Sequence, residues 1–395
     1  MPEYRGPARP TRAPIAILAG TRPECLKLVS LVQALRQGER PLVLIGSGQH
    51  PAMIRQTLAH WDLVPDLELP PPPAPGSLSA TVRWLRDQAR TAIDTLGASA
   101  LVVQGDTSSA YAGALAAKAA GVCLLHVEAG LRTSDPLRPF PEEVFRRRIA
   151  RLADWHFAPT AGAAANLYAE GIARERVQVS GNTGVDALRL ALSDDLPCDQ
   201  IAWEERFPRL LVLTLHRREN YGPRLEHVCD AVLELLALQP ELGVVCPMHP
   251  NPSIGARMRR LLGAHPRIWL TEPLAYRPFV RLLAQASLVI TDSGGIQEEA
   301  PYLGVPVVVA RENTERPEAL ACGATRLVSA DRQTILAAAL ELLAAPRPAV
   351  VPFTPSAPFG DGLAGKRIAA HITALLAIAP AQAQAVDAAI ATTPT

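Results

Sequence analysis

Short apolar stretches alternate with longer amphipathic stretches along most of the 395-residue chain. Runs of Val, Ile and Leu are typical of buried parallel strands, and the longer helical patterns between them are typical of crossover helices. The predicted strands are 15–19, 42–46, 100–104, 122–127, 155–158 and 177–179, followed by 210–215, 242–246, 267–270, 288–291, 305–309 and 324–328. Each set of six is expected to form one sheet.

The two sets are separated near residues 193–207, where the pattern gives way to a polar segment that contains proline. We therefore predict an α/β protein with two doubly wound domains, 1–195 and 196–360, whose strand ends face a cleft. Residues 361–395 are predicted to form a helix, which could pack back on the N-terminal domain, and a frayed tail. The proline-rich segment 65–76 is predicted to be a surface loop.

Composition excludes several classes of protein. The 39 Lys and Arg residues balance 38 Asp and Glu residues, so nothing global attracts the chain to nucleic acid or to an anionic membrane. No apolar run reaches the length of a membrane span, and prolines interrupt the N-terminal segment. The six cysteines include no C-x-x-C pair and are expected to be buried thiols, neither a disulfide framework nor a metal site. We predict a cytoplasmic protein.

Arginine supplies 36 of the 39 cationic side chains, because the only lysines are Lys27, Lys118 and Lys366. Coding bias in a GC-rich genome explains this excess, together with the 37 prolines. It leaves Lys27 as a residue of interest, since a compact ammonium stands where the chain otherwise uses a planar guanidinium.

Polar residues follow the first predicted strand in the sequence Gly20-Thr21-Arg22-Pro23-Glu24, and Lys27 lies one turn into the next helix. Ligands of open parallel sheets bind outside the carboxyl ends of the strands. The N–H groups of the helix start, with Arg22 and Lys27, could therefore hold an anion. An ordinary capped helix with solvated cations is an equally good interpretation of this stretch alone.

Three carboxylates follow other strands of the first domain. Asp106 and Glu128 each come directly after a strand, and Glu142, next to Glu143, opens a helix after a proline-bounded loop. Helix capping explains each of them separately, and for Asp106 alone it is the better explanation. Their convergence on one sheet edge favours proton transfer instead, because neighbouring carboxylates can have raised pKa values.

The second domain has similar strand ends. His216 and Arg217 follow its first strand, and His249 lies in a proline turn after the next; a solvated charge run and a rigid turn are the competing interpretations. The most specific signal is 292–295, Asp-Ser-Gly-Gly, where backbone N–H groups opening a helix could cradle a diphosphate. Glu298 or Glu299 could bind a ribose, and Arg316 a phosphate. No G-x-G-x-x-G sequence points to a nicotinamide dinucleotide, so a nucleotide-sugar enzyme fits best.

The ordered motifs resemble a known family, the non-hydrolysing UDP-N-acetylglucosamine 2-epimerases. The resemblance runs from Gly20 to about Val328. It covers Gly-Thr-Arg-Pro-Glu at 20–24, Ser-Gly-Gln-His at 47–50, Gly-Asp-Thr at 105–107, His-Val-Glu-Ala-Gly-Leu-Arg-Thr at 126–133, Pro-Phe-Pro-Glu-Glu at 139–143, His-Arg-Arg-Glu-Asn at 216–220, Asp-Ser-Gly-Gly-Ile-Gln-Glu-Glu-Ala-Pro at 292–301 and Thr-Glu-Arg-Pro-Glu-Ala at 314–319.

The resemblance implies two Rossmann-like domains in a GT-B-like arrangement, a homodimer, no cofactor, and interconversion of UDP-GlcNAc with UDP-ManNAc. The family reaction eliminates UDP to leave a 2-acetamidoglucal and then adds UDP back. By resemblance, the catalytic residues are Asp106, Glu128, Glu142 and His216. The substrate-binding residues implied are Arg22, Lys27, Asp106, Glu128, Arg146, His216, Phe279, Ser293, Gly294, Gly295, Glu299 and Arg316.

Bacterial members also have a second, activating UDP-GlcNAc site, and the residues of matching type here are Gln49, His50, Arg217 and His249. The chain departs from the family pattern at three places: Phe145 before Arg146, Gly184 in place of a β-branched residue, and the proline-rich loop at 70–77. Phe145 could repack the sugar pocket, and the altered loop bears on activation more than on chemistry.

Three other functions remain open from the sequence. A 2-epimerase of UDP-2,3-diacetamido-uronic acid would need an additional cation that the sequence does not locate. A glycosyltransferase of the same fold would not require three carboxylates on its first domain. A non-catalytic sugar-nucleotide sensor is disfavoured because every expected catalytic carboxylate is present.

Overall fold

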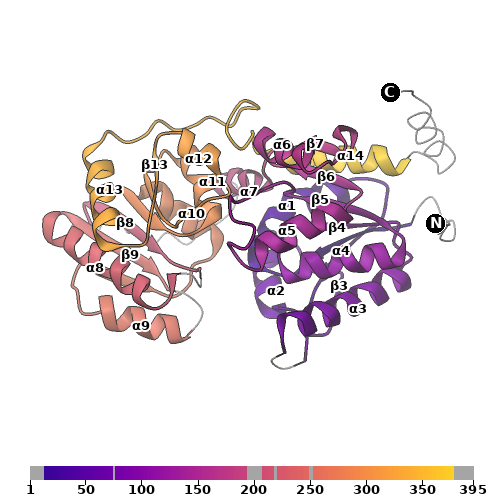
Figure 1. The fold of residues 1–395 in the computed structure, drawn as a ribbon, viewed down its shortest axis with the longest axis horizontal. Coiled ribbons are helices and arrows are strands. Elements are labelled where there is room, and N and C mark those ends of the chain that lie inside the picture. Colours follow the sequence, from indigo (N-terminus) through magenta and orange to yellow (C-terminus); the bar gives the residue numbers. More distant parts are fainter. Residues whose placement is uncertain (1–12, 74–75, 194–206, 218–219, 249–251, 378–395) are drawn as a thin grey trace. The chain divides into compact units, whose positions relative to one another are not determined.

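The computed structural model describes residues 13–73, 76–193, 207–217, 220–248 and 252–377. These residues form two compact units, coloured along the chain in Figure 1. Unit 1 contains the chain up to Asp186 and the chain from Leu363 onward, and unit 2 is Ala187–Gly362. None of the helices in these ranges is long and apolar enough to cross a membrane.

Unit 1 is built on a seven-stranded sheet in which every pairing is parallel, with the order β3-β2-β1-β4-β5-β6-β7. Its strands are β1 (Ile15–Ala19), β2 (Leu42–Gly46), β3 (Leu67–Glu68), β4 (Ala100–Gln104), β5 (Cys123–Val127), β6 (Trp155–Ala158) and β7 (Val177–Val179). Strands β1 and β4 are buried along their whole length, as expected for central strands covered on both faces.

The helices of unit 1 fall into two groups. They are α1 (Arg22–Arg36), α2 (Pro51–Ala59), α3 (Leu78–Leu96), α4 (Ser108–Ala120), α5 (Glu142–Leu152), α6 (Ala161–Ala169) and α14 (Ala364–Ala377), with α7 (Thr183–Leu192) leading into unit 2. Helix α4 packs against α3 and α5, and α1 packs against α2 and α14. Because strand order reverses between β1 and β4, right-handed crossovers place these groups on opposite faces of the sheet.

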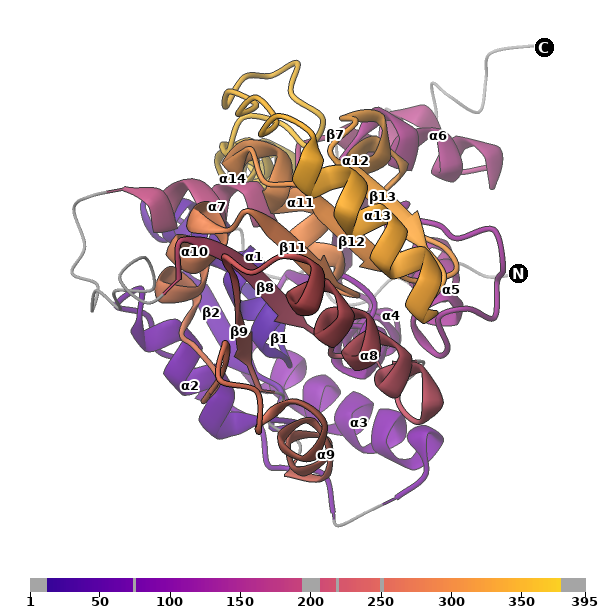
Figure 2. The same cartoon turned by 90° about the vertical axis from the view of Figure 1, so that its left-hand side faces the viewer.

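Unit 2 has a six-stranded sheet, again with parallel pairings, in the order β10-β9-β8-β11-β12-β13. Its strands are β8 (Arg209–Thr214), β9 (Leu242–Pro247), β10 (Ile268–Thr271), β11 (Leu288–Thr291), β12 (Val307–Ala310) and β13 (Thr325–Val328). Its helices are α8 (Pro223–Leu238), α9 (Pro252–Leu262), α10 (Tyr276–Gln285), α11 (Gly294–Leu303), α12 (Pro317–Ala321) and α13 (Arg332–Ala344), and Figure 2 gives a second view of them.

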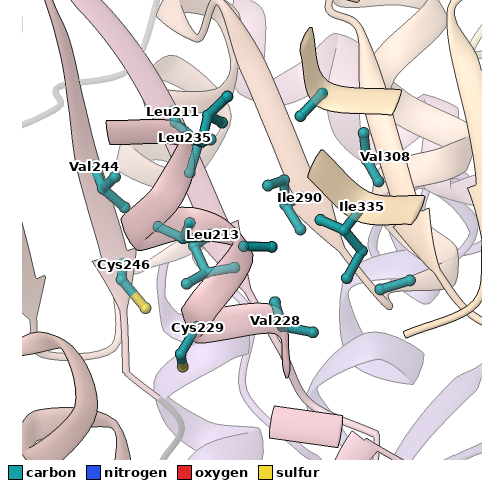
Figure 3. Packing of buried hydrophobic residues seen from close by; sticks show 14 of the residues in the cluster. Leu211, Leu213, Val228, Cys229, Leu235, Val244, Cys246, Ile290, Val308 and Ile335 are labelled. Carbon is teal, nitrogen blue, oxygen red and sulfur yellow. The ribbon is translucent and has the colours of Figure 1, made fainter. Parts of the chain in front are cut away.

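The core of unit 2 lies between this sheet and the helices α8 and α13, which pack against each other. Figure 3 shows Leu211 and Leu213 of β8 pointing toward Val228 and Leu235 of α8, with Ile335 of α13 nearby. Most of the side chains in this core are Leu, Ile and Val, and the rest are Ala, Cys and Met. The central strands of the sheet are buried on both faces, which explains why the sequence shows continuous apolar runs rather than alternation.

The C-terminal helix α14 belongs to unit 1 and packs against α1. The Asp186 carboxylate accepts hydrogen bonds from the N–H groups of Ala364 and Gly365, at 2.9 and 2.7 Å, and so caps the start of α14. Further along α14, the ring of His371 contacts the rings of Trp155 and Phe157 of β6 edge-on. The chain therefore leaves unit 1 near Asp186 and returns to it at Leu363.

The twelve predicted strands are all present, with ends that differ by two residues at most. The prediction of a surface loop at 65–76 is wrong for Leu67–Glu68, which pairs with Ile45 and Gly46 as the edge strand β3. The prolines at 65 and 70 flank this strand and do not fall within it, so the N–H groups needed for this short ladder are available. Among the described cysteines, Cys25, Cys229 and Cys246 are buried free thiols, Cys123 and Cys322 are half-buried free thiols, and Cys198 lies outside the described residues.

Candidate active site

The turns that follow β1, β4 and β5 lie side by side at the carboxyl edge of the unit 1 sheet, because these three strands are neighbours. Gln104 at the end of β4 is in register with Val127 at the end of β5. Asp106 and Glu128, which follow these two residues, therefore leave the sheet at the same edge. The structure brings together the two strand-end carboxylates that the sequence analysis singled out.

Asp106 is paired with Arg146 of α5. The Arg146 Nη2 atom lies 2.6 Å from Oδ2 of Asp106, and its Nη1 atom lies 2.8 Å from Oε2 of Glu143. Glu143 is fully buried and also accepts a hydrogen bond from Nε of Arg147. The helix cap is Thr107, whose side chain accepts from the Ala110 N–H, so capping does not explain Asp106.

Glu128 is held by Lys27, whose Nζ lies 2.8 Å from Oε1, while the side-chain amide of Gln104 donates to Oε2. The side chains of Lys27 and Glu128 are only 12% and 9% exposed, so little water screens the pair. Glu128 has a φ of 64°, in the left-handed region that a non-glycine residue adopts at a cost. Backbone strain at a residue whose carboxylate is aimed at a lysine is typical of a functional position.

The remaining unit 1 residues from the sequence prediction lie at helix starts. Arg22 is the first residue of α1 and is half-buried, like Glu142, the first residue of α5. Arg146 follows Glu142 by one helical turn, so α5 carries both an acid/base candidate and the partner of Asp106. Phe145 stacks on Tyr111 of α4, with ring centroids 4.8 Å apart, within the core between these helices.

His126 of β5 supports the turn that carries Asp106. Its Nε2 atom lies 2.8 Å from the carbonyl oxygen of Gly105. Burial lowers the pKa of His126 to about 4, so the neutral ring donates Nε2–H to this carbonyl at neutral pH. Gly105 has a φ of 68°, and the hydrogen bond helps to fix the sharp turn before Asp106.

In unit 2, the buried carboxylate of Asp292 joins two strand ends. It accepts hydrogen bonds from the backbone N–H groups of His216 and Arg217, and from the side chain of Asn220 at 2.9 Å. Asn220 also donates to the carbonyl of Ala310. These bonds fix the His216 loop against the turn that begins α11.

Arg316 lies against the start of α11. Its Nε donates to Glu298 at 2.6 Å and its Nη1 to Glu315 at 3.0 Å, and Glu315 also pairs with the fully buried Arg311. A Cβ atom added to Gly294 would lie 2.6 Å from Cζ of Arg316. Glycine is therefore needed at position 294, where a guanidinium approaches the exposed N–H groups that open a helix, an arrangement suited to a phosphate group.

The predicted ribose and base contacts also lie close together on unit 2. The hydroxyl of Tyr276 on α10 donates to Oε1 of Glu299 at 2.8 Å, and Phe279 follows Tyr276 by three residues on the same helix. Ser293 occupies the N-cap position of α11 without a side-chain capping hydrogen bond, and Gly295 is the second residue of the helix.

The residues assigned to an activating site belong to different units. Gln49 and His50 follow β2 in unit 1, where Gln49 accepts a hydrogen bond from the Ser109 hydroxyl and His50 is exposed. Arg217 belongs to unit 2 and donates through Nε to the carbonyl of Asp292. His249 lies outside the described residues.

Sequence reasoning did not identify the residues that support the site: Glu24, Gln104, Thr107, His126, Glu143, Asn220, Asp292, Arg311 and Glu315. Several of them lie in the motifs quoted above, beside the predicted site residues. A usable signal exists for two of them: Asp292 comes directly after a strand, and Thr107 directly precedes a helix. No comparable signal marks Glu143 or Glu315, whose partners are fixed only by tertiary packing.

Each unit thus presents a distinct chemistry. Unit 1 offers carboxylates held by cations and suited to moving a proton, and unit 2 offers helix N–H groups and a guanidinium suited to a diphosphate. Within the described ranges, no three side chains of His, Cys, Asp and Glu gather as a metal ion would require.

Comparison with known proteins agrees with this description. The family model for UDP-N-acetylglucosamine 2-epimerase matches residues 33–373. The chain is 39% identical to the UDP-N-acetylglucosamine 2-epimerase of Salmonella typhimurium over 362 residues, which cover 88% of this chain and 95% of that protein.

Solved structures give the same result. The S. aureus MnaA co-structure with UDP superposes with a TM-score of 0.85 at 36% identity, over 92% of this chain and 97% of that one. The Neisseria meningitidis UDP-GlcNAc 2-epimerase bound to UDP-GlcNAc has a TM-score of 0.84 at 33% identity, over 91% and 99%. The glycosyltransferase SnogD of Streptomyces nogalater shares the fold alone, with a TM-score of 0.53 at 14% identity, over 92% and 100%.

Two Rossmann-like units with these polar strand ends define a sugar-nucleotide enzyme of GT-B-like fold. Within that class, the chain belongs to the UDP-N-acetylglucosamine 2-epimerase family, a family of isomerases. The predicted fold class and the predicted family are both confirmed.

Proposed function

We propose that the protein is a non-hydrolysing epimerase that interconverts UDP-GlcNAc and UDP-ManNAc. The observation that carries the proposal is the pair of cation-held carboxylates, Asp106 with Arg146 and Glu128 with Lys27, at one sheet edge in a member of this family. Elimination requires a base at carbon 2 and cations for the departing diphosphate, and both kinds of group are present.

In the proposed reaction, a carboxylate of unit 1 removes the proton from carbon 2 while the bond from carbon 1 to the UDP oxygen breaks. The electron pair of that bond leaves with UDP, and a double bond forms between carbons 1 and 2 of the 2-acetamidoglucal. A second carboxylic acid then protonates carbon 2 from the opposite face, and the UDP oxygen adds back to carbon 1. Atoms and charge balance without a cofactor.

The roles follow from the environment of each group. Asp106, Glu128 and Glu142 are the acid/base candidates, and His216 assists at the diphosphate or the sugar. Arg22 and Lys27 of unit 1 and Gly294, Gly295 and Arg316 of unit 2 are assigned to the diphosphate. Ser293, at the N-cap position of α11, joins them. Glu299 is assigned to the ribose and Phe279 to the uracil. Since Lys27 neutralises Glu128, diphosphate binding at Lys27 would also change the proton affinity of that carboxylate.

Incubation with UDP-GlcNAc in deuterated water, followed by NMR, tests this function. We expect deuterium at carbon 2 and the appearance of UDP-ManNAc. Release of free N-acetylmannosamine with UDP would indicate hydrolysis, and the absence of exchange would contradict the proposal. An Asp106→Asn variant with near-full turnover would remove Asp106 from the acid/base set.

We further infer a cytoplasmic homodimer that a second UDP-GlcNAc activates at Gln49, His50, Arg217 and His249. Gln49 supports this, since Ser109 holds its side chain on the turn next to the Arg22 turn. Epimerisation starting from pure UDP-ManNAc should then show a lag that added UDP-GlcNAc removes. Gln49→Ala should weaken that activation, and sedimentation should give twice the chain mass. A linear start without UDP-GlcNAc would contradict the activating site.

A further inference from the structure

Glu24, in the first turn of α1, is a buried carboxyl group that the reaction described above does not use. Its side chain is 1% exposed. Oε2 accepts the N–H of Gly20 at 2.8 Å, and Oε1 accepts the hydroxyl of Thr107 at 2.6 Å. The two oxygens of one carboxylate therefore connect the turn after β1 to the turn after β4.

Thr107 is fixed from both sides. Its hydroxyl oxygen accepts the N–H of Ala110 at 3.1 Å and so caps α4, and its single proton is donated to Glu24. Asp106 is the preceding residue. Any change in the Glu24 carboxylate is therefore transmitted through one hydroxyl group to the backbone that carries Asp106.

The two turns also pack without space between them. A Cβ atom on Gly20 would lie 2.0 Å from Oγ of Ser109, in the first turn of α4, and 2.9 Å from Oγ of Ser47. The hydroxyls of Ser47 and Ser109 are 2.8 Å apart. This close approach excludes water from Glu24, and its polar contacts here are backbone and hydroxyl groups.

We propose that Glu24 is a positioning residue that fixes the Arg22 turn and the Asp106 turn relative to each other through its bonds to Gly20 and Thr107. The inference rests on the proposed function insofar as these turns carry the diphosphate and acid/base groups. It adds a residue whose role is to hold geometry rather than to touch the substrate.

The arrangement requires the ionised carboxylate, because two donors converge on it. A proton on either oxygen turns that oxygen into a donor, so the Gly20 N–H or the Thr107 hydroxyl must change partner. Burial raises the pKa of Glu24 to about 7, against the lowering effect of Thr107, Gly20 and Thr21. The two hydrogen bonds that Glu24 accepts from Gly20 and Thr107 are therefore both formed only as pH rises through about 7.

The other titratable groups near Glu24 have partners or environments of their own. On its own helix, the Cys25 thiol has a raised pKa because of burial and the Glu24 charge, Arg22 is half-buried, and Lys27 is paired with Glu128. Asp106, on the facing turn, is paired with Arg146. His50, on the turn after β2, is exposed.

The variants follow from the hydrogen bonds. Glu24→Gln has one acceptor and one donor and so imitates the protonated carboxyl group at every pH. Thr107→Val removes both the bond to Glu24 and the α4 cap, whereas Thr107→Ser keeps both. Thr160→Val is the matched control, because Thr160 caps α6 of the same unit through the Ala163 N–H at 3.0 Å.

In kinetics at about pH 8.5, Glu24→Gln and Thr107→Val should lower kcat by about 10- to 100-fold with a smaller change in KM, as displacement of catalytic groups does. Thr107→Ser should restore most of the rate. Thr160→Val should lose similar thermal stability without the loss of kcat. The wild-type kcat should rise with pH through about 7, and this limb should be absent from Glu24→Gln. A Glu24→Gln enzyme with wild-type kcat and pH profile would overturn the inference.

A second measurement does not depend on activity or on any variant. With 15N-labelled glycine and threonine, the amide resonances of Gly20 and Thr107 in the wild-type protein should shift together with a midpoint near pH 7. Flat resonances across this range overturn the positioning role even if the enzyme is active. A joint shift without exchange at carbon 2 supports the positioning role and contradicts the proposed function instead.

Discussion

The carboxylate of Asp292 accepts a hydrogen bond from the backbone N–H of His216, with N–O distances of 2.9 and 3.2 Å. Asp292 follows β11 and His216 follows β8, and these two strands are neighbours in the sheet. Both strands are buried, and their last residues, Thr214 and Thr291, are in register with hydroxyl oxygens 2.7 Å apart. The His216 loop is therefore fixed at its root, although the His216 side chain itself is exposed.

Asp292→Asn should therefore lower kcat by about 10-fold or more through displacement of His216. Oδ1 of Asp292 accepts the N–H of His216, and Oδ2 accepts the N–H of Arg217 and the amide of Asn220. An amide NH2 group in either position would face a donor, so at least one of these bonds is lost. Asp331→Asn is the matched control, since the Asp331 carboxylate also accepts two backbone N–H groups, from Gln333 and Thr334, at a helix start in the same unit. Steady-state kinetics should show a kcat loss only for Asp292→Asn, and thermal melts should show little change for Asp331→Asn, because Asn caps a helix about as well as Asp.

Lys27 should not be replaceable by a neutral side chain. Lys27→Met leaves the buried Glu128 carboxylate without its ammonium and removes a cation from the diphosphate, so kcat should fall by about 100-fold. Lys27→Arg should recover only part of this, because the larger planar group cannot occupy the same point. Lys118→Met, which breaks a comparable but exposed pair with Asp154, should leave kcat within about 2-fold. Equal losses for both lysines would contradict this role.

The two glycines at the start of α11 should differ in tolerance. A methyl group at Gly294 collides with the Arg316 guanidinium at 2.6 Å, whereas the nearest atoms to one at Gly295 are 3.8 Å away or more. Gly294→Ala should therefore weaken UDP binding by about 10-fold or more, and Gly295→Ala by about 2-fold or less. Isothermal calorimetry with UDP measures both, and the reverse order would exclude Arg316 from the diphosphate site.

Acid should destabilise unit 1 through its buried histidines. Burial lowers the pKa of His126 to about 4 and that of His156 to about 3, from an ordinary value of 6.5. The unfolded chain therefore binds more protons than the folded one in this interval. The contribution of each histidine to stability is complete above about pH 6.5 and decreases as pH falls toward the folded values, by up to about 1.4 kcal/mol per pH unit.

His156→Leu should reduce the loss of stability at acid pH, because it removes a group that takes up a proton on unfolding. The substitution breaks no hydrogen bond of the ring, since neither ring nitrogen of His156 has a partner in the described part of the chain. Denaturation in urea at several pH values measures the effect. Glu24 acts in the opposite direction, since its raised pKa favours the folded state at low pH and is a cost as pH rises through about 7. Comparison of the wild type with His156→Leu separates the contribution of His156 from that of Glu24. If the slope of unfolding free energy against pH is unchanged in His156→Leu, other groups cause the loss of stability in acid.

The sequence was most informative where one local rule decided the outcome. Continuous Val and Leu runs indicated buried parallel strands, and polar residues directly after them, such as Asp106 and Glu128, were placed at one edge by topology alone. The resemblance to a family then supplied the substrate class. Local pattern could not resolve the Leu67–Glu68 strand, because two residues carry no periodicity.

The sequence did not indicate which charged side chains pair with each other. Nothing in the spacing of Glu142 and Glu143 indicated that the second would be buried between Arg146 and Arg147, or that Arg146 would reach Asp106. The choice of helix cap was misjudged for a related reason. Asp106 and Thr107 are both good caps by residue type, and in the structure Thr107 caps α4 while its hydroxyl donates to Glu24.

The return of α14 to unit 1 also fixes an order of events during synthesis. The sheet of unit 1 is complete in the chain by Val179, yet the helix that covers α1 is translated only after all of unit 2. All of unit 2 must therefore be synthesised before Asp186 can bind the N–H groups of Ala364 and Gly365. The unit whose translation begins first is the last to be finished, and until then α1 exposes apolar surface that chaperones can bind.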